Sequence, residues 1–309
     1  MLINLTLKQI ANICHGRLMG EDALVTAVVT DTRESLEGVL FVALKGDLFD
    51  GHEFAHQALE KGASGVLVEQ NIAAKPAIIV DNTLSAYAKL AHFLRQQFTA
   101  PVIAITGSNG KTTVKDWLSQ ILASQHQVLK TAKNNNNQIG VPKTLLQLSA
   151  DHTVAIIEAG TSFPGEIEAM AAVLQPDIAI ITNASGCHFE GFGTIAAIAK
   201  EKGALLTATK ADGLVILNAD DASFSYWKTL SGHCRIKSFG FASTADLQAC
   251  NLSLSAGQSS VTFVYEGQRV DLLIGSPGKH QVYNALAVTL ALLEMGMDFA
   301  AAVATLVRP

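Results

Sequence analysis

Apolar runs alternate with stretches of helical spacing along the whole chain, and the rhythm changes near residue 100. Before that point the runs are short, which predicts a small α/β unit. The predicted strands are 25–30, 39–44, 65–69 and 77–80, and the predicted helices are 7–15, 54–61 and 83–98. The tripeptide Thr99-Ala100-Pro101 then breaks the pattern. We therefore predict one domain over residues 1–98 and a second over residues 99–309.

The second part of the chain repeats an apolar strand, a turn and a longer helix. Its predicted strands are 102–106, 154–158, 178–182 and 214–218. Continuous apolar runs of this kind are typical of parallel strands buried on both faces. Beyond Ser238 the apolar positions alternate at 252–254, 260–265 and 270–273, which predicts a small antiparallel appendage, and 282–295 is helical again. The fold class is thus α/β, with a mostly parallel sheet in the central domain.

Composition excludes several classes of protein. The chain has 309 residues, of which 49% are hydrophobic, and a net charge of −5 without a long basic run. A nucleic-acid-binding protein would show a basic patch, so we do not expect this chain to bind nucleic acid. The apolar stretches are shorter than the ~20 residues of a spanning helix, and no signal peptide opens the chain. The four cysteines lie far apart, which fits a reducing cytoplasm better than a disulfide framework or a zinc site.

The sequence T-G-S-N-G-K-T-T, which starts at Thr106, lies between an apolar strand and a helix with one apolar face. Such a loop turns its backbone N–H groups and a helix N-terminus toward an anion. Lys111 would reach the β- and γ-phosphates, and the Thr112 hydroxyl would ligate Mg²⁺. The predicted nucleotide-binding residues are Gly107, Ser108, Asn109, Gly110, Lys111, Thr112 and Thr113.

The loop departs from the common G-x-x-x-x-G-K-[ST] pattern, because position 105 is Ile and only Gly107 precedes Gly110. A glycine turn with a surface lysine is the alternative interpretation. The strand before the loop, the helix after it and the K-T-T within it favour a nucleoside triphosphate. A GTPase would also need N-K-x-D, which is absent. The classes of protein that remain possible are ATPases, kinases and ATP-driven ligases.

Three further blocks follow the loop: N-N-N-x-I-G-V-P from Asn135, a strand that ends in Glu158, and T-N-x-x-x-x-H from Thr182 to His188. Together with the loop they resemble the Mur ligase superfamily over nearly the whole chain. The resemblance is closest to the branch that joins D-alanyl-D-alanine to UDP-N-acetylmuramoyl-tripeptide. The blocks that carry it are 131–146, 165–167, 188–193 and 199–203. A neighbouring branch would show N-T-T-P-like and D-H-L-D-Y-H-like elements, and neither is present.

The resemblance implies that Lys111, Glu158, His188 and Lys202 are catalytic, and that Thr112, Glu158, His188 and Lys202 hold Mg²⁺. Glu158 ends a buried strand beside the loop, where an acid commonly meets Mg²⁺, although a capping role is the alternative. His188 can ligate a cation when neutral, or it is an ordinary turn histidine. Lys202 matches the lysine that this family carbamylates. Without the family it would be a solvated helix residue, and Lys200 is the competing candidate.

The resemblance also implies binding residues for the two nucleotides. Thr32, Arg33 and Lys45 match segments that bind the UDP-sugar, with surface ion pairs as an equal alternative. The asparagine run adds Asn134, Asn136 and Asn137 to the predicted substrate site. Asn284, in P-G-K-H-Q-V-Y-N-A, matches the asparagine that meets adenine, since an amide offers both a donor and an acceptor. His280 lies nearby in the same element.

The implied activity is ATP-dependent amide-bond formation through an acyl phosphate, in peptidoglycan precursor synthesis. We expect ATP and Mg²⁺ as cofactors, UDP-N-acetylmuramoyl-tripeptide and D-alanyl-D-alanine as substrates, and a cytoplasmic monomer. The alternatives are a related ligase that adds a different amino acid, and a non-catalytic module that binds ATP or the UDP-sugar.

Three departures from the family pattern qualify this expectation. Ser162 and Phe163 stand where an Asn-His pair is usual, and Cys187 stands where a small Ala is common. The chain ends at Pro309, where the family continues into a C-terminal Rossmann-like domain that closes over the site. We therefore expect ATP and UDP-substrate sites without efficient turnover in this chain alone.

Overall fold

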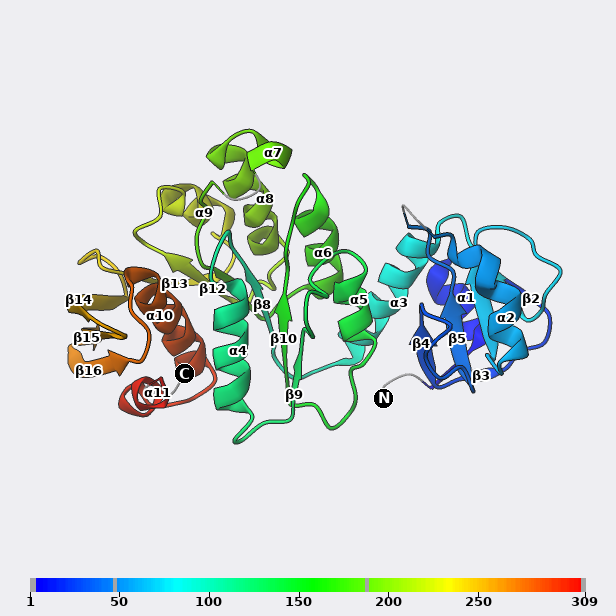
Figure 1. Ribbon diagram of the computed structural model, residues 1–309, viewed down its shortest axis with the longest axis horizontal. Coiled ribbons are helices and arrows are strands. Elements are labelled where there is room, and N and C mark those ends of the chain that lie inside the picture. The colour runs from blue at the N-terminus through cyan, green and yellow to red at the C-terminus, as the bar shows by residue number, and fades with distance from the viewer. Residues whose placement is uncertain (1–3, 47–48, 187–188, 307–309) are drawn as a thin grey trace. The chain divides into compact units, whose positions relative to one another are not determined.

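The computed structural model describes residues 4–46, 49–186 and 189–306, which form two compact units (Figure 1). The first unit comprises Met1–Thr99 together with Gln138–Asp151, and the second comprises Ala100–Asn137 together with His152–Pro309. The segment Gln138–Asp151 thus lies in the first unit, although its sequence position falls within the predicted second domain. Within the described ranges, no helix is both long and apolar enough to cross a membrane.

The first unit is built on a mostly parallel sheet. Its described strands are β2 (Arg17–Met19), β4 (Ala27–Val29), β5 (Val39–Val42), β6 (Gly65–Val68) and β7 (Ala77–Ile79), in the order β2-β7-β6-β5-β4 with β2 antiparallel. The short strands β1 (Leu5–Thr6) and β3 (Leu24–Val25) pair separately. The helices are α1 (Leu7–Cys14), the 3₁₀ turn η1 (Gly51–Phe54), α2 (Ala55–Glu60), α3 (Thr83–Gln97) and α5 (Gly140–Leu145).

Local chemistry explains where the helices of this unit begin. Thr6 and Gln9 form a capping box at the start of α1, and His15 ends that helix in a left-handed conformation. Asn82 accepts a hydrogen bond from the Ser85 backbone N–H at 2.8 Å and starts α3. Polar residues at these helix starts therefore set the predicted boundaries near residues 7 and 83.

The second unit contains one continuous sheet. Its described strands are β8 (Val102–Thr106), β9 (Val128–Lys130), β10 (Val154–Glu158), β11 (Ile178–Ile181), β12 (Leu214–Asn218), β13 (Arg235–Gly240), β14 (Leu247–Ser255), β15 (Gln258–Tyr265) and β16 (Gln268–Ile274). Their order is β16-β15-β14-β13-β12-β11-β8-β10-β9, parallel from β9 to β14 and antiparallel from β14 to β16. The helices are α4 (Lys111–Leu122), α6 (Glu166–Leu174), α7 (Phe189–Phe192), α8 (Ile195–Thr207), α9 (Phe224–Leu230), α10 (Lys279–Glu294) and α11 (Phe299–Thr305).

Helices cover both faces of the central strands. Ile103 and Ile105 of β8 belong to the same buried cluster as the apolar residues of α4 and α10. Because side chains alternate along a strand, Val102 and Ala104 point to the opposite face, where they are also fully buried. Helix α8 contacts β8 and β11 and packs against α6 and α9. Strands buried on both faces explain the continuous apolar runs of the sequence.

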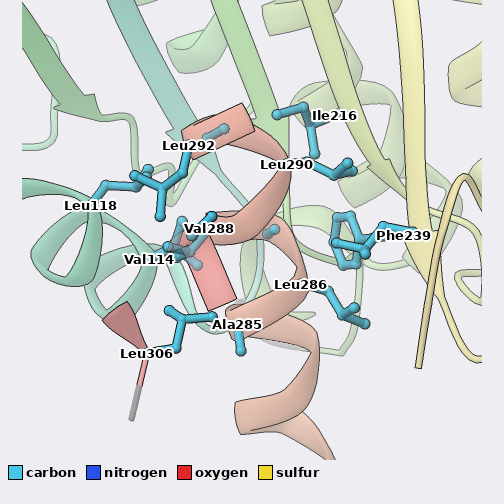
Figure 2. Close-up of a cluster of buried hydrophobic side chains, with 14 of the residues drawn as sticks. Val114, Leu118, Ile216, Phe239, Ala285, Leu286, Val288, Leu290, Leu292 and Leu306 are labelled. Atoms are coloured by element: carbon cyan, nitrogen blue, oxygen red, sulfur yellow. The ribbon is translucent and has the colours of Figure 1, made fainter. Parts of the chain in front are cut away.

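Helix α10 lies in the middle of a large cluster of buried hydrophobic residues. It is buried on most of its circumference, as expected for a helix that is apolar on nearly every side. Figure 2 shows Val288 and Leu292 directed toward α4, and Leu286 and Leu290 directed toward the sheet. The polar Thr289 is fully buried, and its hydroxyl donates to the Ala285 carbonyl at 2.8 Å. This packing fixes the start of α10 beside the loop that follows β8.

The structure confirms the α/β fold class, and β8, β10 and β12 have the predicted bounds. The antiparallel strands are longer than predicted and extend the main sheet through the parallel β13–β14 pair. The sequence pattern missed β1, β2, β9, β13 and α5. Strand β13 contains Arg235 and Lys237, so it lacks the apolar run by which its parallel neighbours were recognised.

Candidate nucleotide and metal site

The carboxyl ends of the parallel strands bring the predicted phosphate loop to the middle of the sheet. Strand β8 lies between β10 and β11. After β8 the chain forms β9 and β10 on one side of it, and then crosses to form β11 and β12 on the other side. A sheet of this kind binds its ligands at the carboxyl edge where the winding reverses. The loop, Glu158 at the end of β10 and Thr182 after β11 all lie at this edge.

Two glycines of the loop make close approaches that other residues would block. Gly107 has a φ of +151°, and a Cβ atom there would overlap the Thr182 hydroxyl. Gly110 has a φ of +87°, and a Cβ atom there would overlap the Asn284 side-chain oxygen. Both positions combine a left-handed backbone with a close neighbour, so the motif glycines are required for this loop conformation.

The segment after β11 holds the loop from the side. The Ser108 backbone N–H donates to the Asn183 carbonyl at 2.9 Å, and the Asn109 backbone N–H donates to the Asn183 side-chain oxygen at 3.1 Å. The Thr182 hydroxyl donates to the Asn109 carbonyl at 2.6 Å. The Ser108 hydroxyl donates to the Ser185 carbonyl at 3.0 Å. Hydrogen bonds within the protein therefore hold the loop in this conformation.

The first turn of α4 directs its N–H groups toward the open side of the loop. Gly110 is the N-cap residue and has no side chain with which to cap the helix. The N–H groups of the first turn have no partner within the helix, which makes this end a site for an anion. The Lys111 ammonium donates to the Gly107 and Ser108 carbonyls at 2.7 and 3.3 Å. Thr113 lies half-buried in the same turn.

Glu158 is the centre of the polar cluster beside this turn. Its side chain is buried, and the Thr112 hydroxyl donates to Oε2 at 3.0 Å while the Asn136 amide donates to Oε1 at 2.9 Å. The Glu158 backbone N–H donates to the Thr131 hydroxyl at 2.9 Å. The ammonium of the buried Lys115 lies 3.6 Å from Oε2. A carboxylate and a hydroxyl oxygen side by side suit Mg²⁺, so Thr112 and Glu158 fit the predicted metal.

The other predicted metal ligands lie on and before α8. Lys202 is buried, with 3% of its surface exposed, whereas the competing Lys200 is exposed. The solvated alternative for Lys202 is therefore wrong. His188 lies outside the described residues. Elsewhere in the described ranges, no group of three or more His, Cys, Asp or Glu side chains gathers as a metal site.

Two carboxylates hold the turn that contains the unusual Ser162-Phe163 pair. Glu166 Oε2 accepts hydrogen bonds from the backbone N–H groups of Ser162 at 2.6 Å and Phe163 at 2.9 Å. Glu201 Oε2 accepts from the Gly165 N–H at 2.8 Å. The Phe163 side chain is 64% exposed. Glu201 thus ties α8, and with it the neighbouring Lys202, to the turn that follows β10.

The start of α10 closes the loop on its other side. Asn284 is buried, and its side-chain oxygen lies against Gly110. Its amide donates to the Gln281 side-chain oxygen at 3.3 Å. His280 is exposed in the first turn of α10. Asn284, which was predicted to meet the nucleotide base, thus lies directly beside the phosphate loop.

A polar and aromatic cluster fixes the start of α10 to the end of β12. The Tyr283 hydroxyl donates to Asp220 Oδ2 at 2.8 Å, and Asp220 also accepts from the Phe241 backbone N–H at 2.7 Å. Burial and the neighbouring Asp220 raise the pKa of Tyr283. The Lys279 ammonium lies 4.5 Å from the centre of the Phe241 ring. The turn after β12 therefore supports the start of α10.

The first unit contains a cavity of about 490 Å³ at the carboxyl ends of β4 and β5. It is lined by Thr30, Asp31, Thr32, Arg33, Phe41, Leu44, Phe49, Gly51, Phe54 and Lys143. Thr32 and Arg33 were predicted to bind substrate. Lys45, predicted with them, is exposed and is not one of these lining residues.

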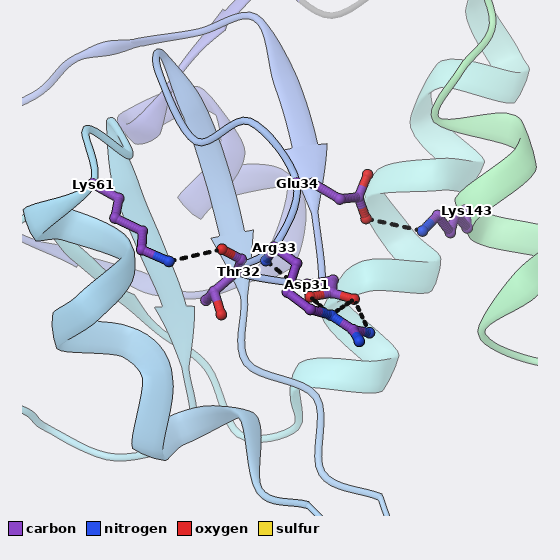
Figure 3. Close-up of polar contacts among 6 residues, drawn as sticks. All are labelled: Asp31, Thr32, Arg33, Glu34, Lys61 and Lys143. Carbon is purple, nitrogen blue, oxygen red and sulfur yellow. Dashed lines mark hydrogen bonds and ion pairs between the residues drawn. The ribbon is translucent and has the colours of Figure 1, made fainter.

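Arg33 and Lys143, which line this cavity, each form an ion pair (Figure 3). Arg33 donates to both oxygens of Asp31, from Nε at 2.9 Å and from Nη2 at 2.6 Å. These bonds lower the pKa of Asp31 to about 2, so the pair persists at neutral pH. Lys143 of α5 lies 3.0 Å from Glu34. The guanidinium already has a carboxylate partner, as the ion-pair alternative predicted, and an incoming phosphate would compete with Asp31 for it.

The asparagine run contributes one residue to the site described above. Asn136 contacts Glu158, and its carbonyl accepts from the Gly160 N–H at 2.7 Å. Asn134 and Asn137 are exposed.

The sequence interpretation missed Lys115 and Glu201 as residues of the site. A charged residue on the apolar face of a predicted helix was the available signal for Lys115, since it follows Val114 on α4.

Comparison with known families gives two matches. The family model described as the Mur ligase middle domain matches residues 105–292, and the model described as the Mur ligase family catalytic domain matches residues 24–100. The first match alone covers more than half of the chain and includes the phosphate loop, Glu158, Lys202 and Asn284.

Individual proteins are also similar to the chain in sequence. The chain is 39% identical, over 96% of its length, to UDP-N-acetylmuramoyl-tripeptide–D-alanyl-D-alanine ligase of Escherichia coli, and 35% identical, over 94%, to that of Bacillus subtilis. It covers 66% and 64% of those proteins, slightly less than two thirds of their length.

Solved structures of MurF resemble the chain in fold. MurF from Acinetobacter baumannii matches with a TM-score of 0.92 and 29% identity, over 99% of this chain and 68% of that one. MurF from Thermotoga maritima in complex with ADP matches with a TM-score of 0.82 and 25% identity, over 92% and 66%.

Replacing Glu201 with Ala tests the connection between α8 and the turn after β10. The substitution removes the acceptor of the Gly165 N–H and of the Ile167 N–H, which donates to Oε1 at 2.7 Å. Unpaired amides cost about 1–3 kcal/mol, so we expect both amides to exchange hydrogen at least about tenfold faster. Glu168→Ala, at an exposed carboxylate in the first turn of α6, is the control and should lower the free energy of unfolding by less than about 1 kcal/mol. Unchanged exchange at Gly165 and Ile167 in Glu201→Ala would show that Glu201 does not hold the turn.

Proposed function

The chain belongs to the Mur ligase family, and on this premise we propose that it acts in an ATP-dependent ligase that joins D-alanyl-D-alanine to UDP-N-acetylmuramoyl-tripeptide. The curated relatives that carry this name support the choice of substrates. The reaction belongs to the synthesis of peptidoglycan precursors in the cytoplasm, and the protein works as a monomer.

The observation that carries this proposal is the hydrogen bond from Thr112 to Glu158 beside the glycine loop, at 3.0 Å. In P-loop enzymes the hydroxyl that follows the loop lysine and an acid at the end of a nearby strand hold Mg²⁺. The N-terminus of α4 would bind the triphosphate, and Lys111 would turn from the loop carbonyls to the phosphates. The relative that was solved with ADP supports the choice of nucleotide.

Two displacements make up the chemistry. A carboxylate oxygen at the end of the tripeptide attacks the γ-phosphorus, the bond to the β-phosphate oxygen breaks, and ADP leaves. The amine of D-alanyl-D-alanine then attacks the acyl carbon, loses a proton, and inorganic phosphate leaves. The Lys111 ammonium and the α4 amides stabilise the charge that develops on the transferred group, and bound Mg²⁺ would neutralise part of it. Most of the rate enhancement comes from positioning.

Lys202 supplies the acidic ligand of a second cation after it reacts with CO₂. Its neutral amine attacks the carbon of CO₂ and loses one proton, which leaves an anionic carbamate on the side chain. Burial distinguishes Lys202 from the exposed Lys200, and the neighbouring Glu201 holds its helix to the turn after β10. His188 would complete this second site.

The remaining residues bind the two nucleotides. Asn284 meets the adenine edge, because it is buried at the start of α10 against the loop that receives the phosphates. His280 contacts the same nucleotide from the exposed first turn. The cavity of the first unit receives the UDP part of the acceptor, with Phe41 and Phe54 as apolar walls for the base. Thr32, Arg33 and Lys45 serve its diphosphate.

Phosphate release from ATP tests the proposed reaction. We expect the complete gene product to release phosphate only when UDP-N-acetylmuramoyl-tripeptide and D-alanyl-D-alanine are both present with Mg²⁺. Replacing the dipeptide with D-alanine, L-lysine or diaminopimelate should abolish release. Release with one of those amines instead would identify a different member of the family. Nucleotide binding without release in any mixture would favour a non-catalytic module.

Lys202→Ala tests the carbamate. We expect loss of activity in the complete gene product, partial recovery with added acetate or formate, and loss of the carbamate carbon signal after ¹³C-bicarbonate labelling. Lys200→Ala is the matched control, two residues earlier on the exposed side of α8, and should keep both activity and signal. Full activity in Lys202→Ala, or a carbamate signal lost only in Lys200→Ala, would refute the assignment.

A further inference from the structure

A buried lysine lies beside the proposed metal site and has no part in the chemistry described above. Lys115 is one turn into α4, and only 3% of its side chain is exposed. Its ammonium lies 3.6 Å from Glu158 Oε2, and the Glu158 side chain is also 3% exposed. Two opposite charges are therefore removed from water together.

The carboxylate of Glu158 is surrounded by donors that belong to the protein. Oε2 faces the Thr112 hydroxyl and the Lys115 ammonium, and Oε1 accepts from the Asn136 amide. A buried carboxylate without a counter-ion would be costly, so the nearby ammonium offsets the cost of burying Glu158 and holds its side chain in place before any ligand arrives. A divalent cation at Glu158 must then share this carboxylate with a positive charge.

The charge of Lys115 is directed mainly at Glu158. Its second acidic neighbour, Asp116, lies 3.6 Å away, but Asp116 is half exposed and has a closer partner in Lys130 at 3.1 Å. Screening by water weakens the contribution of an exposed pair, whereas the Lys115–Glu158 pair is shielded from water. Lys130 therefore serves as a matched surface lysine on the same network.

We propose that Lys115 is a positioning residue that acts as the resident counter-ion of Glu158 and keeps the site's affinity for a free divalent cation low. The cation then binds tightly only with the nucleotide, whose phosphates add the negative charge that offsets the ammonium. The proposal rests on the proposed function, since it takes Glu158 as a Mg²⁺ ligand. Its consequence is that the metal and the nucleotide enter together.

Manganese binding followed by electron paramagnetic resonance tests this proposal. Lys115→Met keeps the side-chain volume and removes the charge. Because like charges repel strongly at this distance in a shielded site, we expect Lys115→Met to bind Mn²⁺ without nucleotide at least about tenfold more tightly than the unchanged protein. With ADP present the difference should shrink. Lys130→Met should bind Mn²⁺ as the unchanged protein does.

The outcomes separate this inference from the proposed function. If the unchanged protein fails to bind Mn²⁺ even with ADP, the metal site itself is wrong and both ideas fall. If it binds Mn²⁺ with ADP and Lys115→Met shows equal or weaker binding without nucleotide, only the role of Lys115 is overturned.

Stability measurements cover the case in which Lys115→Met is destabilised. The buried carboxylate without its counter-ion should lower the urea midpoint of unfolding. Adding Glu158→Gln to the same chain should recover most of that loss, because it removes the buried charge. Absence of recovery in the double variant would mean that Lys115 acts through packing and would contradict the counter-ion role.

Discussion

The buried carboxylate of Glu158 is the constraint on which the rest of the site depends. A glutamate with 2% of its surface exposed needs donors for its carboxylate, and the chain supplies them from two separate segments. Thr112 comes from the helix after the loop, Asn136 from the asparagine run, and Lys115 from the buried face of the same helix. Satisfying one acid therefore fixes the relative positions of the phosphate loop, the asparagine run and the end of β10.

The glycine loop adds a second constraint, which is steric. Gly107 and Gly110 contact Thr182 and Asn284, so the loop conformation depends on segments that follow β11 and begin α10. The bonds between the loop and Asn183 make the same connection through the backbone. Few of these groups need to move when an anion arrives, which is the condition for electrostatic stabilisation of a transferring phosphate.

Much of the fold could be predicted from the sequence, because buried parallel strands leave continuous apolar runs and the phosphate loop has a strong motif. Strand β13 was missed because Arg235 and Lys237 interrupt its pattern, and the six-residue helix α5 is too short for a periodic signal. The site was predictable only where a motif marks it. Lys115 was marked only by its place on the apolar face of a predicted helix, and its pairing with Glu158, far along the chain, leaves no record in local spacing. The Arg33–Asp31 pair, two residues apart, was foreseeable as an alternative to phosphate binding.

The central claim is that the loop and Glu158 together form one Mg²⁺-nucleotide site. Calorimetric binding of ADP with Mg²⁺ tests it most directly in the unchanged protein, in Gly107→Ala and in Gly232→Ala, a glycine with open space around it. The account predicts that Gly107→Ala weakens binding at least about tenfold, because a Cβ atom forces the loop away from Thr182, and that Gly232→Ala binds normally. Equal affinity in all three proteins, with Mg²⁺ making no difference, would contradict it.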